Sequence, residues 1–145
     1  MGMEGLGIGA DFDLAAYESS GLNVSLKDAE AVTFINFLDA GTQTMTLQET
    51  LPDGTGDQNL VIIDTVYAKP KAGGAWTKIT QTALATYDHS TDATNDVIAI
   101  TVKATQLSDG FQNVEMTAGT GTCVAILHGL HVQRAPENMP NPIVA

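Results

Sequence analysis

The sequence predicts an all-β fold, an antiparallel β-sandwich of the jelly-roll or immunoglobulin-like type. Thr makes up 18 of the 145 residues and, together with Val and Ile, favours a pleated surface. Seven or eight short segments of alternating or continuous apolar character are separated by Gly, Asp and Asn turns. Strand and helix patterns do not alternate along the chain, which argues against a doubly wound parallel sheet.

The individual strands follow from patterns with a period of two. In residues 42–49, Met45 and Leu47 point to one face and the Thr side chains to the other. Residues 31–38 are apolar on both faces, and the short Asp39-Ala40-Gly41 segment predicts that they form a hairpin with 42–49. The other expected strands are residues 60–67, as a central strand, 76–79, 96–102, 112–117 and 122–132, the last two joined by a turn at 118–121.

Two segments compete with the strand prediction. Ser25-Leu26-Lys27-Asp28 fits a capping box and predicts one short helical turn, and residues 81–86 are small and apolar but too short to form a helix alone. Residues 107–114 resemble the sheet-to-sheet corner of immunoglobulin-like domains, with Phe111 in place of the usual Tyr. We therefore expect the chain to cross between sheets there.

The chain length of 145 residues fits a single domain. We expect the sandwich to span residues 11–134, between a flexible N-terminal arm at 1–10 and a C-terminal arm at 135–145 that holds three of the five prolines. Docking of such an arm on another molecule is favourable because it buries the apolar side chains, and proline lowers the conformational entropy lost when the arm becomes ordered. The expected partner-contact residues are Leu6, Ile8, Met139, Pro140, Pro142, Ile143 and Val144.

The charge balance excludes several classes of partner. With 17 acidic and 6 basic side chains, the formal net charge is −11, and no basic stripe is available for nucleic acid or for an anionic membrane. Residues 1–66 carry a net charge of −10 and residues 67–145 a net charge of −1, which suggests an electrostatically polarised surface. We expect an acidic, soluble protein without a membrane span or a secretion signal.

Histidine and cysteine offer weak signals for chemistry. His128 and His131 lie three residues apart, which on a strand places them on opposite faces, so that ordinary strand positions near an edge explain them better than a metal site. Cys123 follows the pattern of a buried small apolar residue, although a pairing with histidine stays open. We expect no metal, no cofactor and no enzymatic activity.

The carboxylates fit turns better than catalytic pairs. Residues 53–59 carry Asp53 and Asp57 in a Gly-rich loop that could hold a hard cation, but a plain hairpin loop is the simpler interpretation. Two further groups lie among Ser, Thr and Asn, which is the composition of solvated turns, whereas a catalytic acid needs a partly dry pocket that raises its pKa. They are Asp11 with Asp13, and Asp88, Asp92 and Asp96. The glycine-rich stretch at residues 5–9 is not followed by the lysine of a phosphate-binding loop.

Four short stretches, 34 of the 145 residues, resemble structural proteins of tailed-bacteriophage virions, in particular the head-decoration and minor capsid group. They are residues 25–34, 41–49, 106–111 and 130–138. The resemblance implies a β-rich homo-oligomer, with a trimer favoured, that binds the lattice of the major capsid protein from outside and reinforces it. It implies a location on the capsid exterior after synthesis in the host cytoplasm, and it implies no catalytic residues.

Three other functions stay open. A carbohydrate-binding or adhesin-like sandwich would need an exposed aromatic platform, and Trp76 is the one candidate, although a role in the core is the simpler expectation for Trp. A tail tube or connector protein would form rings or tubes. An enzyme would require a constellation of residues that the sequence does not display.

Overall fold

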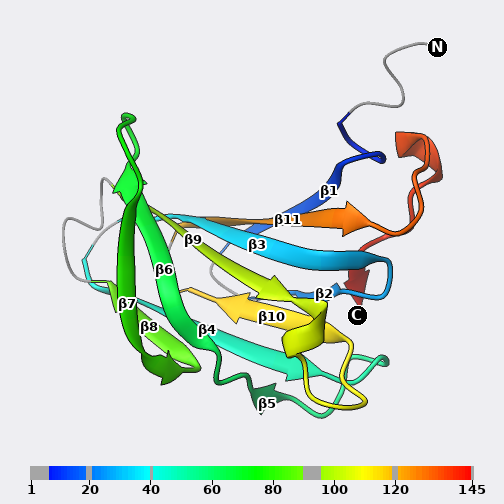
Figure 1. Cartoon of the computed structure of the whole chain (residues 1–145), viewed down its shortest axis with the longest axis horizontal. Coiled ribbons are helices and arrows are strands. Elements are labelled where there is room, and N and C mark those ends of the chain that lie inside the picture. The colour runs from blue at the N-terminus through cyan, green and yellow to red at the C-terminus, as the bar shows by residue number, and fades with distance from the viewer. Residues whose placement is uncertain (1–6, 19–20, 40, 90–95, 119–120, 145) are drawn as a thin grey trace.

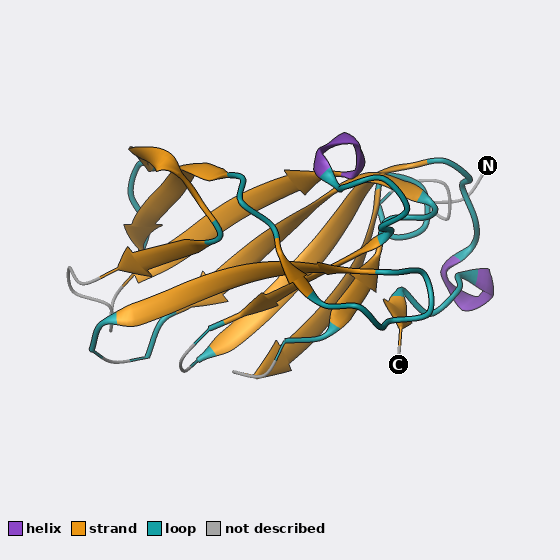
Figure 2. Cartoon of the chain, turned by 90° about the horizontal axis from the view of Figure 1, so that it is seen from below, coloured by secondary structure: helices purple, strands orange, loops and turns teal. Residues whose placement is uncertain are grey.

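The computed structural model confirms the predicted β-sandwich (Figure 1). It describes residues 7–18, 21–39, 41–89, 96–118 and 121–144. Two sheets of six strands each, here called sheet A and sheet B, pack face to face, and all neighbouring strands are antiparallel. The helices in the described part are the short 3-10 turns η3 (Ala104–Gln106) and η4 (Pro136–Asn138) (Figure 2).

The strand order of each sheet follows from the pairing. Sheet A runs β1 (Phe12–Glu18), β11 (Thr122–Leu130), β3 (Ala29–Phe37), β9 (Asp96–Lys103), β6 (Ile63–Pro70) and β7 (Thr77–Leu84). Sheet B runs β12 (Ile143–Val144), β2 (Asn23–Ser25), β10 (Asn113–Thr117), β4 (Gln43–Thr50) and β5 (Gln58–Asn59), and β8 (Thr86–His89) also pairs with β4.

Successive strands alternate between the two sheets. Strands β1 and β3 lie in sheet A and β2 and β4 in sheet B, and the chain alternates again from β8 to β11. This alternation is the jelly-roll arrangement, one of the two types that the sequence predicts. The β6–β7 hairpin adds two strands to one edge of sheet A.

Two predicted hairpins are wrong for one physical reason. Segments 31–38 and 42–49 become β3 and β4, which lie in different sheets, and segments 112–117 and 122–132 become β10 and β11, which also lie in different sheets. A strand pattern determines which side chains face the core, but a neighbour in the same sheet and a neighbour across the core satisfy it equally well.

Other expectations differ in detail. The strand expected at 60–67 is β6, which lies second from the edge of sheet A instead of in its centre. The strand at 76–79 extends to Leu84, so that the helix considered at 81–86 does not form. At Ser25 the hydroxyl accepts the Lys27 amide at 3.2 Å in the turn between β2 and β3, and no helical turn follows. The chain does cross between sheets after η3, as the corner pattern at 107–114 predicts.

The core lies between the sheets. Its largest fully buried side chains include Phe34, Met45, Leu47, Ile98 and Met116. Tyr17 of sheet A is buried, and its hydroxyl donates to the Met116 carbonyl of sheet B at 2.6 Å. No helix in the part of the chain that the structure describes is long and apolar enough to cross a membrane.

Candidate functional site

The N-terminal and C-terminal segments meet at one end of the sandwich (Figure 1). The Arg134 amide donates to the Gly9 carbonyl at 2.9 Å, and the Gly9 amide donates to the Phe12 carbonyl at 2.8 Å. Further along, the Ser25 amide donates to the Pro142 carbonyl at 2.8 Å, and Ile143 pairs with Val24. Both segments are therefore held by backbone hydrogen bonds to their own chain.

The structure brings most of the expected partner-contact residues to this end. Met139, Pro140, Pro142 and Val144 line one groove, and Ile143 packs against the core through β12. Ile8 is exposed and forms a backbone bridge with Phe12, and Leu6 lies outside the described residues. Their contact with another molecule stays a prediction.

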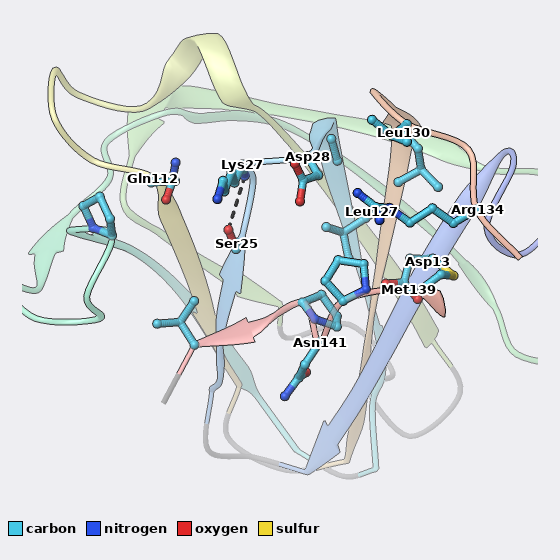
Figure 3. A pocket seen from close by; sticks show the side chains of 16 residues that line it. Asp13, Ser25, Lys27, Asp28, Gln112, Leu127, Leu130, Arg134, Met139 and Asn141 are labelled. Carbon is cyan, nitrogen blue, oxygen red and sulfur yellow. Dashed lines mark hydrogen bonds between the residues drawn. The ribbon is translucent and has the colours of Figure 1, made fainter. Parts of the chain in front are cut away.

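The groove has a volume of about 450 Å³ and lies between β1, the end of β11, the β2–β3 turn and the C-terminal segment (Figure 3). Apolar side chains of Leu127, Leu130, Val132 and Met139 form part of its lining. Its charged side chains are Asp13, Lys27, Asp28 and Arg134. Among the described residues none of these four is joined to another in an ion pair, so the groove offers both apolar contact area and free charges.

The outer face of sheet A carries large apolar side chains and lysines, with threonines such as Thr33 and Thr101 between them. Four large apolar side chains in the described strands are 40 to 49% exposed, and all four belong to sheet A: Leu14, Phe37, Tyr67 and Leu84. The pairing places the half-buried Ile35, Val124 and Ile126 on the same face as Leu14 and Phe37. Lys69, Lys78 and Lys103 also lie on this face, with the Asp64 carboxylate at its margin. Glu18, at the end of β1, lies outside the described side chains.

The outer face of sheet B is polar and acidic. Thr44, Thr46 and Gln48 of β4 alternate with the buried Met45 and Leu47. The strands of sheet B contain no Lys or Arg, whereas they carry Asp88 and Glu115. The Thr44 hydroxyl donates to Asp88 at 2.6 Å, and partial burial together with the nearby Asp57 carboxylate raises the pKa of Glu115. The two outer faces therefore differ in both polarity and charge.

The β6–β7 hairpin carries an exposed indole. Trp76 is 44% exposed, so the expectation that it fills the core is wrong. The Lys69 ammonium lies 4.8 Å from the centre of its ring, a cation–π contact. The Lys71 ammonium donates to the Leu38 carbonyl and ties the hairpin to the end of β3.

The histidine and cysteine candidates have structural contacts. His128 belongs to β11, which lies second from the edge of sheet A, and its ring lies 3.0 Å from the Thr33 hydroxyl. His131 is exposed and lies beyond the end of β11. Cys123 is buried, as predicted, and burial raises its pKa to about 11. In the described part no three His, Cys, Asp or Glu side chains are grouped as metal ligands would be.

The carboxylate candidates do not converge. Asp53 accepts the Thr55 amide and hydroxyl at 3.0 and 2.7 Å within the β4–β5 connection, which is a hairpin loop as predicted. Asp13 lines the groove, and Asp11 accepts the Gly7 amide at 3.3 Å. Asp88 lies on the outer face of sheet B, and Asp92 lies outside the described residues.

A buried polar chain that the sequence does not predict lies between the sheets. The Tyr87 hydroxyl lies 2.8 Å from His89 Nδ1, and His89 Nε2 lies 2.6 Å from an Asp96 carboxylate oxygen. Tyr87 and His89 belong to β8 of sheet B and Asp96 to β9 of sheet A, so these contacts tie the sheets together. Because His89 and Tyr87 are buried, the arrangement resembles an internal brace more than a reaction site. Only the alternation of Tyr87 and His89 along β8 could have indicated their common inward orientation.

Comparisons with known proteins give no family. No family model matches the chain, and no curated protein matches it. Among solved structures, the chain is similar to the SPBc2 prophage-derived protein YomS, with 9% identity, a TM-score of 0.37, and coverage of 80% of this chain and 93% of that chain. It is also similar to Eiger TNF from S. frugiperda, with 9% identity, a TM-score of 0.29, and coverage of 90% and 99%, respectively.

Proposed function

We propose that the protein is a structural component of a virion that binds the outer surface of the capsid lattice as a homo-oligomer and stabilises it. One observation carries the proposal: the two outer faces of the sandwich differ. Sheet A presents Leu14, Phe37 and Tyr67 together with lysines, whereas the strands of sheet B present polar and acidic side chains and no basic ones. A protein that covers a surface needs one face to bind and another that stays in water.

The apolar face supports this function energetically. Contiguous exposed apolar side chains mark interaction surfaces, because each square ångström of apolar area removed from water contributes about 25 cal/mol. Exposed aromatic side chains such as Phe37 and Tyr67 are typical of the residues that dominate binding energy. On a lattice, several weak contacts add through multivalency, so each single interface can be small.

A role without catalysis is part of the proposal. In the described part, the candidates His128, His131, Cys123 and Asp53 are spread over the molecule. His89 does contact the candidate Asp96, but this histidine is buried between the sheets. Cys123 is buried with a raised pKa, which disfavours the reactive thiolate.

Phe37 provides the test of the binding face. Phe37→Glu places a charge on the outer face of sheet A, at the end of β3, without disturbing the core, since the side chain is 40% exposed. The matched control is Thr46→Glu, which places the same charge on the outer face of sheet B. We expect Phe37→Glu to lose at least about tenfold in affinity for capsids assembled without this protein, measured by sedimentation and mass spectrometry of the bound chain, and Thr46→Glu to bind like wild type.

The opposite result contradicts the proposal. If wild-type protein does not sediment with capsids, or if Thr46→Glu abolishes binding and Phe37→Glu does not, sheet A is not the binding face. Removal of residues 135–145 provides a second test, in which we expect weaker lattice binding or oligomerisation with the fold intact. Occupancy equal to wild type would exclude a role of the C-terminal segment in binding.

A carbohydrate-binding function is the second candidate. It is favoured by the exposure of Trp76, whose ring lies beside the Lys69 ammonium on the hairpin, an arrangement that could stack on an acidic sugar. Binding to a glycan array that Trp76→Ala abolishes would support this function. Wild-type protein that binds no glycan on the array would exclude it.

A further inference from the structure

We propose that the copies of this protein join head to tail: the β6–β7 hairpin of one copy docks in the groove beneath the C-terminal segment of a second copy, and Trp76 enters that groove. This inference rests on the oligomer of the proposed function and names its interface. It concerns the contact between copies, which uses the hairpin and the groove, whereas the centre of the sheet A face is left for the lattice.

The hairpin has the features of an inserting element. It projects from the edge of sheet A beyond the rest of the molecule (Figure 1), and Trp76 lies just before β7 with almost half of its surface in water. The Lys69 contact and the anchoring of Lys71 to the Leu38 carbonyl hold the hairpin in one conformation, which lowers the entropy lost on binding. Tryptophan is among the residues that most often anchor protein interfaces.

The hairpin is also basic within an acidic protein. Three of the six basic residues lie on it, Lys69, Lys71 and Lys78, and residues 65–87 contain no Asp or Glu. The remainder of the chain therefore holds all 17 acidic side chains against three basic ones, a net charge of −14. Most of the surface of a second copy is thus electrostatically complementary to the hairpin.

The groove has the matching features. Its volume of about 450 Å³ and its lining by Leu127, Leu130, Val132 and Met139 suit a large apolar side chain. Asp13 and Asp28 line the same groove and can meet the lysines of the hairpin, and Lys27 and Arg134 also line it. Within the lining, Asp13 and Asp28 balance Lys27 and Arg134. Further carboxylates lie at this end of the molecule, among them Asp11, Glu30 and Glu137, together with Lys103.

The hairpin and the groove lie at opposite ends of sheet A. Phe12 pairs with His128 and Ala29 with Leu130 at the groove end, whereas Pro70 pairs with Asp96 at the hairpin end. A hairpin therefore cannot reach the groove of its own copy. The contact between copies is heterologous, and it closes into a ring, such as a trimer, or continues as an open chain.

The experiment measures the native mass of the purified protein over a series of concentrations up to about 100 µM, so that a Kd of association is obtained for wild type and for each variant. Mixing is done at a concentration at which wild type is associated and the single variants are not. We expect an oligomer for wild type. Trp76→Ala removes the inserting side chain, and Val132→Arg adds bulk and positive charge to the groove. Both residues are exposed, so both variants are expected to fold. Each alone should raise the Kd of association by about 30-fold, and the matched control Val61→Arg, at an exposed position outside the groove lining, should not.

Mixing the two variants is the decisive step. The Trp76→Ala copy keeps an intact groove and the Val132→Arg copy keeps an intact hairpin, so an equimolar mixture can form one contact and should give a heterodimer, with twice the single-chain mass of 15.2 kDa. A symmetric contact that uses the same patch on both copies is not restored by mixing.

Several results would overturn the inference: wild type that is monomeric, single variants that assemble like wild type, Val61→Arg that disrupts assembly as strongly as Val132→Arg, or a mixture that stays monomeric. Trp76→Ala that assembles normally but loses binding to an acidic polysaccharide would overturn it in favour of a glycan site on the hairpin. Capsid binding is measured separately with Phe37→Glu. Wild-type protein that binds capsids but forms no head-to-tail contact would therefore refute this inference alone.

Discussion

The packing of the two terminal segments can be tested at one glycine. Gly9 has a φ of +89°, and a Cβ built on it would lie 2.1 Å from the Arg134 carbonyl oxygen. Gly9→Ala therefore combines two effects: a left-handed backbone, at about 1–2 kcal/mol, and a displacement of Arg134 that breaks its hydrogen bond to Gly9, at about 1 kcal/mol. We expect a loss of about 2–3 kcal/mol of local stability, equivalent to about 30- to 150-fold faster hydrogen exchange of the Arg134 amide.

Gly110→Ala separates the two effects. Gly110 has a nearly equal φ of +84°, but a Cβ added there would meet no atom within 4 Å. Both variants should lose about 1–2 kcal/mol from the backbone conformation, measured by urea unfolding, but only Gly9→Ala should accelerate exchange at Arg134. If the Arg134 amide exchanges at the same rate in both variants, the contact between the terminal segments does not form in solution. The groove would then lack the lining that these segments contribute.

Three further predictions concern the sandwich itself. Phe34→Ala should lower the free energy of unfolding by about 3–5 kcal/mol in urea, because Phe34 is fully buried; a smaller loss would mean that the core collapses around the cavity. Cys123 should resist iodoacetamide at about pH 8 in the folded protein and react once urea unfolds it, since burial raises its pKa to about 11; fast native labelling would contradict its burial. Because burial and Asp57 raise the pKa of Glu115 from 4.5, the folded state loses stability as the pH rises through that pKa, so Glu115→Gln should be more stable than wild type at neutral pH and equal to it below about pH 4. If Glu115→Gln and wild type have the same urea midpoint as each other at neutral pH as well as below about pH 4, this prediction is contradicted.

The pattern of side chains was sufficient to predict the class of the fold. The alternation in β4 places Met45 and Leu47 in the core, and the same rule applied to β3 buries Phe34. The corner after η3 was also predictable, because it depends on neighbours in sequence. Burial of Cys123 followed from its apolar surroundings in β11. These features are local, so the order of the residues contains the information that they need.

Positions that depend on distant contacts were not predictable from the sequence. The predictions of a hairpin between β3 and β4 and of a buried Trp76 are wrong, because a pattern with a period of two specifies neither the neighbouring strand nor the edge position of β7. The polarisation of charge along the chain indicated a polarised surface without locating it, since strands from both halves interleave in sheet A.

The sequence alone determined that the chain forms a sandwich with apolar terminal segments and an excess of negative charge. Only the tertiary structure decided that these segments meet around one groove, that the exposed apolar residues of the strands gather on sheet A, and that Trp76 projects at the opposite end. The physical reason is that local propensities act between residues close in the chain, whereas a surface is composed of residues that pairing across long sequence separations brings together.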